Sequence, residues 1–342
     1  MRIISLSLFL AMTAFSRDAL AQLAVGEVAG TYQSNGTSHR FHGYVAVLDL
    51  SSRRFLPVVR RPPSCGKPSF APLATTSAWA NSVGAFLAVN GSFSLPEREY
   101  KPGDCLQMIG PLKSAGTLVV PGANRPDGQG NPALLFNAAG APRITMAAAR
   151  DVAAAYNVLS GQWQECTNPA PNCPPIPHNG TLLISGGTLM GATALPVPDE
   201  AAPRTAVGLT RDSVLIVVMI EGRLPDSDGI DLPGLAELLN AFQAYDAVNL
   251  DGGGSSTMMY APVGPLPAEE NLKLYTLIRN AQRQDASGLT FTFTQRDPRV
   301  PFASRASDAF SSSGRGATGN RLYRPVTSQW GFRLAHTPTS PE

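Results

Sequence analysis

The sequence predicts a mixed α+β and α/β fold, in which helices pack on a central mixed β-sheet that contains one strand-helix-strand crossover. Three observations predict it. Runs of strand-forming residues alternate with glycine and proline along the chain. An amphipathic helical pattern over 232–242 lies between two apolar runs, 214–220 and 246–250. With 342 residues, 43% hydrophobic and 15% charged, the chain is long enough to bury a full core.

The first 21 residues have the pattern of a cleaved secretory signal. One arginine precedes a short apolar stretch from Ile3 to Phe15, and small residues stand at Ala19 and Ala21. The stretch is too short to span a membrane, and no later run reaches 18 apolar residues. We therefore expect a secreted or periplasmic location, cleavage near Ala21 and no stable membrane insertion.

Four cysteines follow this segment, an even number in a chain bound for an oxidising compartment. Of the three pairings, we favour Cys65 with Cys105 and Cys166 with Cys173. A zinc site is the alternative, but the chain has no Cys-x-x-Cys pair and its four histidines are scattered. The sequence thus predicts structural disulfides, no metal and no cofactor.

Short strand-like runs follow one another through the first half of the chain. They cover residues 43–50, 54–60, 85–90, 133–137, 142–146 and 181–186. Residues 166–180 contain five prolines and predict an irregular excursion. Beyond residue 297 apolar residues become sparse, so we expect one domain over 22–297 and a loosely ordered extension over 298–342, with a last strand near 329–334.

A polar loop over 210–213 separates two strand-forming runs and predicts an antiparallel hairpin. We expect Leu209 to face Val214 and, in the same register, Arg204 to face Met219. Side chains alternate between the two faces of a strand, so Arg204 would then lie on the face of Glu221, diagonally adjacent to it.

The predicted helix has Asp231 as its N-cap and joins the runs 214–220 and 246–250. A strand-helix-strand crossover makes its two strands parallel, so Glu221 and Asp251 are expected at the same carboxyl edge. For neighbouring strands the two carboxyl groups would lie roughly 5 to 10 Å apart, the range used by paired residues in glycoside hydrolysis.

Residues 249–257 read "NLDGGGSST" directly after the last of these strand runs. Ligands settle at the carboxyl ends of strands, and consecutive glycines expose backbone N–H groups as an anion-binding concavity. The alternative is a turn that only glycine can adopt. The polar residues expected at the same edge favour a site; they are Asn90, Arg204, Glu221 and Asp251.

Several of these residues also have a purely structural interpretation. Arg204 can serve only as the ion-pair partner of Glu221, and Asn90 can cap a turn. The hydroxyls of 255–257 more often satisfy a turn than act as nucleophiles. The segment 226–231 resembles a calcium loop but lacks its closing Glu, so helix capping is favoured. The histidines, at 39, 42, 178 and 336, are interpreted as surface or core residues.

The motifs at this edge resemble the phosphodiester glycosidase family. The likeness covers roughly 85–293, the core of the predicted domain, and rests on the segments "AVNGSFS", "PRTAVGL", "VVMIEGR", "DGIDLPGLAELLNAF" and "DAVNLDGGGSSTM". The family usually has Asp where this chain has Glu221.

The resemblance implies a secreted glycosidase that hydrolyses a sugar-1-phosphodiester at the anomeric C–O bond and releases the free sugar and a phosphomonoester. On matched positions it implies that Asp251 is the catalytic carboxylate and Arg204 the phosphate partner, and we assign Glu221 as the assisting acid or water-orienting group. The expected substrate-binding residues are Asn90, Gly91, Arg204, Asn249, Gly252, Gly253, Gly254 and Ser255.

Two other functions stay open, a non-catalytic binding protein for anionic phosphorylated glycans and a phosphodiesterase that cleaves the P–O bond. A binder of anions has no reason to place Glu221 and Asp251 beside a phosphate, and P–O cleavage more typically uses metal ligands. With 27 basic and 25 acidic residues, a net charge of +2 and no basic stripe, the chain is not expected to bind nucleic acid.

Overall fold

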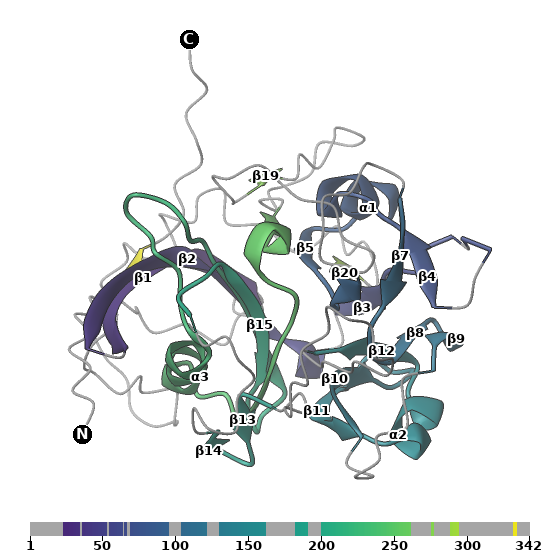
Figure 1. Ribbon diagram of the computed structural model, residues 1–342. Coiled ribbons are helices and arrows are strands. Elements are labelled where there is room, and N and C mark those ends of the chain that lie inside the picture. Colours follow the sequence, from purple (N-terminus) through teal and green to yellow (C-terminus); the bar gives the residue numbers. More distant parts are fainter. Residues whose placement is uncertain are drawn as a thin grey trace, which may run out of the picture.

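The computed structural model describes residues 23–34, 36–52, 55–63, 65–66, 69–95, 104–121, 130–161, 182–190, 200–260, 275–276, 288–293 and 331–333. These residues form mostly β-sheet with a few short helices (Figure 1). The predicted combination of sheet and helix is therefore present, with strands in the majority.

The largest sheet has eight strands, and each of its neighbouring pairs is antiparallel, so the predicted mixed sheet is corrected to an antiparallel one. In spatial order they are β14 (Thr188–Leu189), β13 (Ile184–Ser185), β17 (Asp246–Asn249), β15 (Arg204–Leu209), β16 (Val214–Ile220), β2 (Thr37–Asp49), β1 (Leu23–Ser34) and β21 (Gly331–Arg333).

Three smaller sheets complete the strand content of the described residues. The first contains β11 (Pro142–Ala147), β10 (Asn131–Phe136), β12 (Asn157–Ser160), β8 (Leu112–Ser114) and β9 (Thr117–Val120). The second contains β19 (Tyr275–Thr276), β18 (Met258–Tyr260), β5 (Leu87–Asn90), β20 (Gly288–Phe293) and β3 (Phe55–Val59). The third contains β4 (Phe70–Pro72), β7 (Cys105–Met108) and β6 (Ser94–Leu95).

The helices are α1 (Thr76–Ser82), α2 (Ala149–Ala154) and α3 (Leu232–Ala241), with the 3-10 turns η1 (Leu50–Ser52) and η2 (Gly253–Ser255). The helix predicted over 232–242 is α3. Asp231 caps it as predicted, because its side chain accepts a hydrogen bond of 2.7 Å from Gly234 N. Asp228, in the segment weighed as a calcium loop, accepts a hydrogen bond from Arg40 N at 2.8 Å.

The apolar run of β16 is buried on both faces of the large sheet. Alternate side chains point to opposite faces, so Ile216 and Val218 pack with α3, while Leu215 and Val217 belong to the core formed with the smaller sheets. Figure 1 shows α3 inside the curve of the large sheet and the smaller sheets on its other side. A continuous apolar strand is typical of this two-sided burial.

The hairpin of β15 and β16 is confirmed, but its register differs from the prediction by one residue. Leu209 faces Leu215 and Arg204 faces Ile220, whereas the sequence reading paired Arg204 with Met219. Thr210 and Val214 extend the hairpin, which leaves a three-residue loop in which Ser213 has a φ of 63°. With this register, strand alternation no longer places Arg204 and Glu221 on one face.

The predicted crossover is also corrected in its strand order. β16 and β17 run in the same direction, as expected, but β15 lies between them and is antiparallel to both. The expected parallel neighbours are therefore separated by two strand spacings, about 10 Å. The strand-helix-strand pattern therefore predicted the direction of β16 and β17 correctly, but it did not predict that β15 lies between them.

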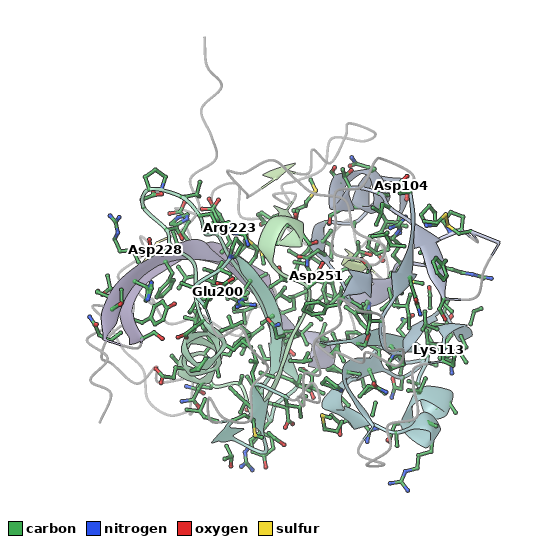
Figure 2. The ribbon with its side chains drawn as sticks, in the orientation of Figure 1. Asp104, Lys113, Glu200, Arg223, Asp228 and Asp251 are labelled. Carbon is green, nitrogen blue, oxygen red and sulfur yellow. A yellow bond between two sulfur atoms is a disulfide. The ribbon has the colours of Figure 1, made fainter. Side chains whose placement is uncertain are left out.

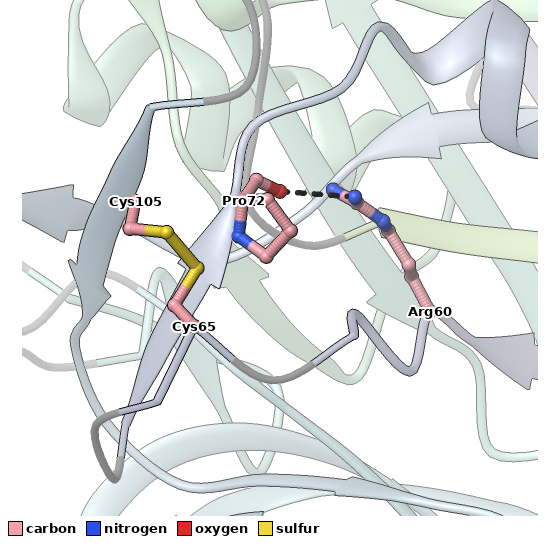
Figure 3. Close-up of a disulfide and its surroundings, with 4 residues drawn as sticks. All are labelled: Arg60, Cys65, Pro72 and Cys105. Atoms are coloured by element: carbon pink, nitrogen blue, oxygen red, sulfur yellow. Dashed lines mark hydrogen bonds between the residues drawn. A yellow bond between two sulfur atoms is a disulfide. The ribbon is translucent and has the colours of Figure 1, made fainter.

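The disulfide between Cys65 and Cys105 is confirmed. Its Cα atoms lie 6.1 Å apart, and it links the segment before β4 to the start of β7 (Figure 3). Nearby, Arg60 donates a hydrogen bond of 3.0 Å to the carbonyl of Pro72. This part of the structure is thus connected both by a covalent bond and by the hydrogen bond of a buried arginine.

Several predictions fall on residues outside the described ranges. They are the signal segment 1–21, the excursion over 166–180, the pair Cys166 and Cys173, and the extension 298–342 except for 331–333. Those three residues form β21 beside β1, so the last strand expected near 329–334 is confirmed. Across the described ranges, no helix is both long and apolar enough to cross a bilayer.

Candidate active site

Three strand ends bring the predicted charged residues to one edge of the large sheet. Arg204 begins β15, Glu221 directly follows β16, and Asp251 follows β17 by two residues. Because β15 is antiparallel to both neighbours, its start and their ends coincide. Arg204 therefore stands between the two carboxylates along this edge.

The glycine-rich segment after β17 is fixed to the start of β15 by its backbone. Leu250 N donates to Thr205 O, and Gly253 N donates to Pro203 O, both at 2.8 Å. Asp251 N donates to the carbonyl of Gly91 at 2.9 Å. The backbone of the candidate catalytic residue is thus held between the large sheet and the end of β5.

Asn90 is the side chain that connects these parts. It is fully buried at the end of β5, where its Nδ2 donates to Asp251 O at 2.7 Å. Its Oδ1 accepts hydrogen bonds from Thr205 Oγ1 at 2.7 Å and from Thr257 N at 3.1 Å. These contacts occupy the amide within the protein, so Asn90 acts as a frame for the site. Asn249, at the end of β17, is buried as well.

The carboxylate of Asp251 lies at the rim of this frame. Its Oδ1 accepts a hydrogen bond of 2.8 Å from Gly252 N, and the residue keeps 8% of its surface exposed. A backbone N–H favours the ionised form of a carboxylate that it binds. Asp251 is therefore oriented by its own turn, at a buried position next to this frame.

Glycine is required at two positions of the run by geometry. A Cβ atom on Gly252 would lie 2.9 Å from Pro203 O, and Gly253 has a φ of +62°. Most of the N–H groups expected to form an anion cradle donate within the protein. The donors are the amides of Gly252, Gly253, Ser255, Ser256 and Thr257. The amides thus mainly stabilise the turn.

Arg204 is buried, with 9% of its surface exposed, and its guanidinium contacts backbone carbonyls. Nε donates to Ile230 O at 3.3 Å and Nη2 to Glu200 O at 3.0 Å. Its Cδ lies 3.7 Å from the position of a Cβ on Gly252. These contacts support the loop before α3 and the first glycine of the run.

A second arginine, Arg223, lies beside the same run and was not singled out by the sequence reading. A Cβ atom on Gly253 would lie 3.7 Å from its Nη2 and 3.9 Å from its Nη1. Figure 2 labels Arg223 and Asp251 beside the glycine-rich turn. The signal available in the sequence was its position two residues after Glu221, at the end of the same strand.

Glu221 is bound to His42, which the sequence reading interpreted as a surface or core residue. The distance between His42 Nδ1 and Glu221 Oε2 is 2.7 Å. The Glu221 side chain is wholly buried, whereas the imidazole keeps 21% of its surface exposed and has Glu27 Oε2 at 4.0 Å from Nε2. The partly exposed His42 imidazole therefore lies between the buried Glu221 carboxylate and the protein surface.

Two hydroxyls beneath the turn complete the site. Ser256 Oγ and Thr257 Oγ1 are buried, and no described residue forms a hydrogen bond with either atom. Buried polar atoms of this kind usually bind an ordered water or a ligand atom. Further along, in β18, burial raises the pKa of the Tyr260 phenol, so this group stays neutral near pH 7.

The chain is similar to one protein family in sequence and to solved structures in fold. The sequence model of the phosphodiester glycosidase family matches residues 84–292. No protein with a curated description matched the sequence.

Two solved structures are similar in fold. One is the catalytic domain of zebrafish N-acetylglucosamine-1-phosphodiester alpha-N-acetylglucosaminidase, auto-inhibited by its pro-peptide. It has a TM-score of 0.56 and 17% identity over 82% of this chain and 86% of that one. The other is a protein from Synechocystis, with a TM-score of 0.50 and 14% identity over 79% of this chain and 62% of that one. At these identities the likeness establishes the fold.

Proposed function

The chain belongs to the phosphodiester glycosidase family, and on this premise we propose that it hydrolyses a sugar-1-phosphodiester at the anomeric C–O bond. The products would be the free sugar and a phosphomonoester. The family resemblance predicted from the sequence over roughly 85–293 is confirmed by the match over 84–292. The zebrafish structure of similar fold carries the name of an enzyme that acts on such a phosphodiester.

The observation that carries the proposal is the placement of opposite charges around one short turn. The Asp251 carboxylate is fixed at its start, Arg204 packs on Gly252, and Arg223 packs on Gly253. A phosphodiester is an anion, and the sugar carbon from which it leaves becomes cationic in the transition state. A carboxylate and a guanidinium beside this one turn match both charges.

We assign Asp251 as the nucleophile or general base. A phosphate is already a good leaving group, so stabilising the sugar cation or activating water matters more than protonating the phosphate. The N–H of Gly252 holds the carboxylate in place beside the turn on which the Arg223 guanidinium rests. Removal of such a group typically lowers the rate by about 10² or more.

The assisting role predicted for Glu221 is proposed here in an indirect form. Its carboxylate is wholly buried against His42, and about 10 Å of sheet separates the β16 and β17 strand ends. Glu221 therefore acts as a positioning residue that holds the imidazole. The other residues predicted from the sequence form the frame and wall of the site; they are Asn90, Gly91, Arg204, Asn249, Gly252, Gly253, Gly254 and Ser255.

A secreted or periplasmic location fits this activity. The Cys65–Cys105 disulfide is of the kind that persists in oxidising compartments. Sugar phosphodiesters occur in envelope polymers and exopolysaccharides, which such a protein would meet outside the cytosol.

The test is hydrolysis of a panel of aryl sugar-1-phosphodiesters by the purified protein in oxygen-18 water. Cleavage of the C–O bond places the label on the sugar. Label on the phosphate would mean P–O cleavage and would refute the proposal. Binding of phosphorylated glycans without turnover, by a protein whose fold is intact, would instead identify a non-catalytic binding protein.

A further inference from the structure

We infer that Arg223 binds the phosphate of the substrate, a role for which the sequence pattern favoured Arg204. The inference rests on the proposed function, because it assigns the anion-binding group of the same site. The two arginines that pack on the glycine run, Arg204 and Arg223, differ in the contacts of their guanidinium groups.

The guanidinium of Arg204 is committed to the fold. It is buried and donates to the carbonyls of Ile230 and Glu200. Binding a phosphate through these donors would require those carbonyls to lose their partners, which is costly for buried backbone. Arg204 therefore supports the loop rather than the substrate.

Arg223 has the opposite character. It is exposed, and within the part of the chain that the structure describes no carboxylate forms an ion pair with it. Its two Nη atoms lie 3.7 and 3.9 Å from the Cβ position of Gly253, so the planar end of the side chain rests on the turn that follows Asp251. A guanidinium with open donors is suited to bidentate contact with a phosphate.

The backbone holds Arg223 in an uncommon conformation. Its φ is 59°, in the left-handed region that residues with a side chain rarely adopt. The tight turn from Leu224 to Ser227 follows directly, with mutual backbone hydrogen bonds of 3.0 and 3.2 Å. Asp228 then anchors the loop to β2 through Arg40, at 2.8 Å in both directions. Such outliers persist where the surrounding structure fixes them, and they cluster at functional sites.

The backbone amides of the glycine-rich turn also favour a side chain as the phosphate ligand. Five amides between residues 252 and 257 donate within the protein, so they leave most of the negative charge of a bound phosphate to a side chain. The Cβ position of Gly253 lies at ordinary van der Waals distance from the Arg223 guanidinium, so this side chain ends directly beside the turn. Arg223 is thus placed to hold the leaving phosphate while Asp251 faces the sugar.

The test compares Arg223→Met and Arg223→Lys with a matched control, Arg211→Met. Arg211 belongs to the same hairpin region but lies at the opposite end of β16, over the ring of Tyr245 at 3.9 Å. Each variant is made in the full chain and also in an Asp251→Asn background. Binding of inorganic phosphate and of methyl phosphate, neither of which has a glycosidic bond to cleave, is measured by titration calorimetry in both backgrounds.

We expect Arg223→Met to raise the dissociation constant for phosphate by about tenfold or more, the typical effect of removing a charge-assisted contact. Arg223→Lys should recover part of the affinity, because it keeps the charge but not the planar fork. In the otherwise unaltered enzyme, Arg223→Met should lower kcat/KM for the phosphodiester, whereas Arg211→Met should match the parent in both assays.

Affinity unchanged in Arg223→Met, with unfolding like that of the parent, would overturn the inference, as would absence of any phosphate binding by the parent. Hydrolysis by the parent together with normal kinetics of Arg223→Met would refute Arg223 but leave the proposed function standing. Phosphate binding that depends on Arg223 in a protein without hydrolytic activity would refute the proposed function and leave the inference standing.

Discussion

His42 Nδ1 and Glu221 Oε2 lie 2.7 Å apart and join β2 to the end of β16 beside the candidate active site. Backbone hydrogen bonds surround the pair, because Glu221 N donates to His42 O and Ser227 Oγ donates to Glu221 O. The carboxylate is wholly buried and the imidazole partly exposed. The contact thus fixes the imidazole orientation at this edge of the sheet.

The first prediction concerns the stability that this pair contributes. Glu221→Ala removes the acceptor of His42 and should lower the free energy of unfolding by about 1 to 3 kcal/mol. Glu221→Gln keeps an acceptor oxygen and should cost less. Urea denaturation at pH 7 measures both, with His39→Gln as the control expected to stay within about 0.5 kcal/mol of the parent. Equal stability of Glu221→Ala and the parent would contradict the structural role.

The second prediction concerns Asp251. Asp251→Asn is nearly isosteric and keeps an oxygen for Gly252 N, so the thermal midpoint should change little. The value of kcat on an aryl sugar-1-phosphodiester should fall by about 10² or more. Glu221→Gln should lower kcat less, because that residue acts through His42. Turnover by Asp251→Asn within a few-fold of the parent would remove Asp251 from the reaction.

The third prediction separates the strain of Gly253 from its function. Gly253→Ala and Gly36→Ala both place a side chain at a positive φ, +62° and +79°, and each should cost roughly 1 to 2 kcal/mol of stability. Gly36 has nothing within 4 Å of its Cβ position, whereas Gly253 has the Arg223 guanidinium there. Relief of the strained φ at Gly253 would shift the turn between Asp251 and the Arg223 guanidinium, so only Gly253→Ala should weaken substrate binding, measured as KM. Parallel behaviour of the two variants would show that the packing of Arg223 on Gly253 is irrelevant.

The fourth prediction concerns the disulfides. Removing the Cys65–Cys105 bridge by a Cys65→Ser and Cys105→Ser double substitution opens a loop closed over a separation of 40 residues. The loop-entropy relation gives a loss of about 4 kcal/mol. Non-reduced peptide mapping should also find Cys166 with Cys173. Crossed partners or free thiols at those two positions would show that this second pairing is wrong.

Local patterns were enough to predict several parts of the fold. The period of the apolar residues and the cap at Asp231 identified α3, and the polar loop identified the hairpin of β15 and β16. The glycine run also marked the correct sheet edge, because strand direction alone brings Glu221 and Asp251 to the same side. Each of these inferences uses residues close together in the sequence.

The errors arose where distant or weak signals decide the outcome. The hairpin register depends on the left-handed conformation of Ser213, and the presence of a serine does not predict this conformation. The insertion of β15 between β16 and β17 is a matter of spatial order, which periodicity does not encode. The contact of His42 with Glu221 spans 179 residues. The contacts of the Arg204 guanidinium with backbone carbonyls were not predicted either, because they depend on the loop around Ile230.

The contacts of Asn90 also bear on when the candidate site forms during folding. Its three hydrogen bonds reach residues that are 115, 161 and 167 positions away, at Thr205, Asp251 and Thr257. Contacts of such long range form slowly, because the entropy cost of closing a large loop must be met before the contacts stabilise the chain. The chain must therefore be synthesised beyond residue 257 before the candidate site can form. A nascent chain that stopped earlier would contain α3 and its sheet without a complete candidate site.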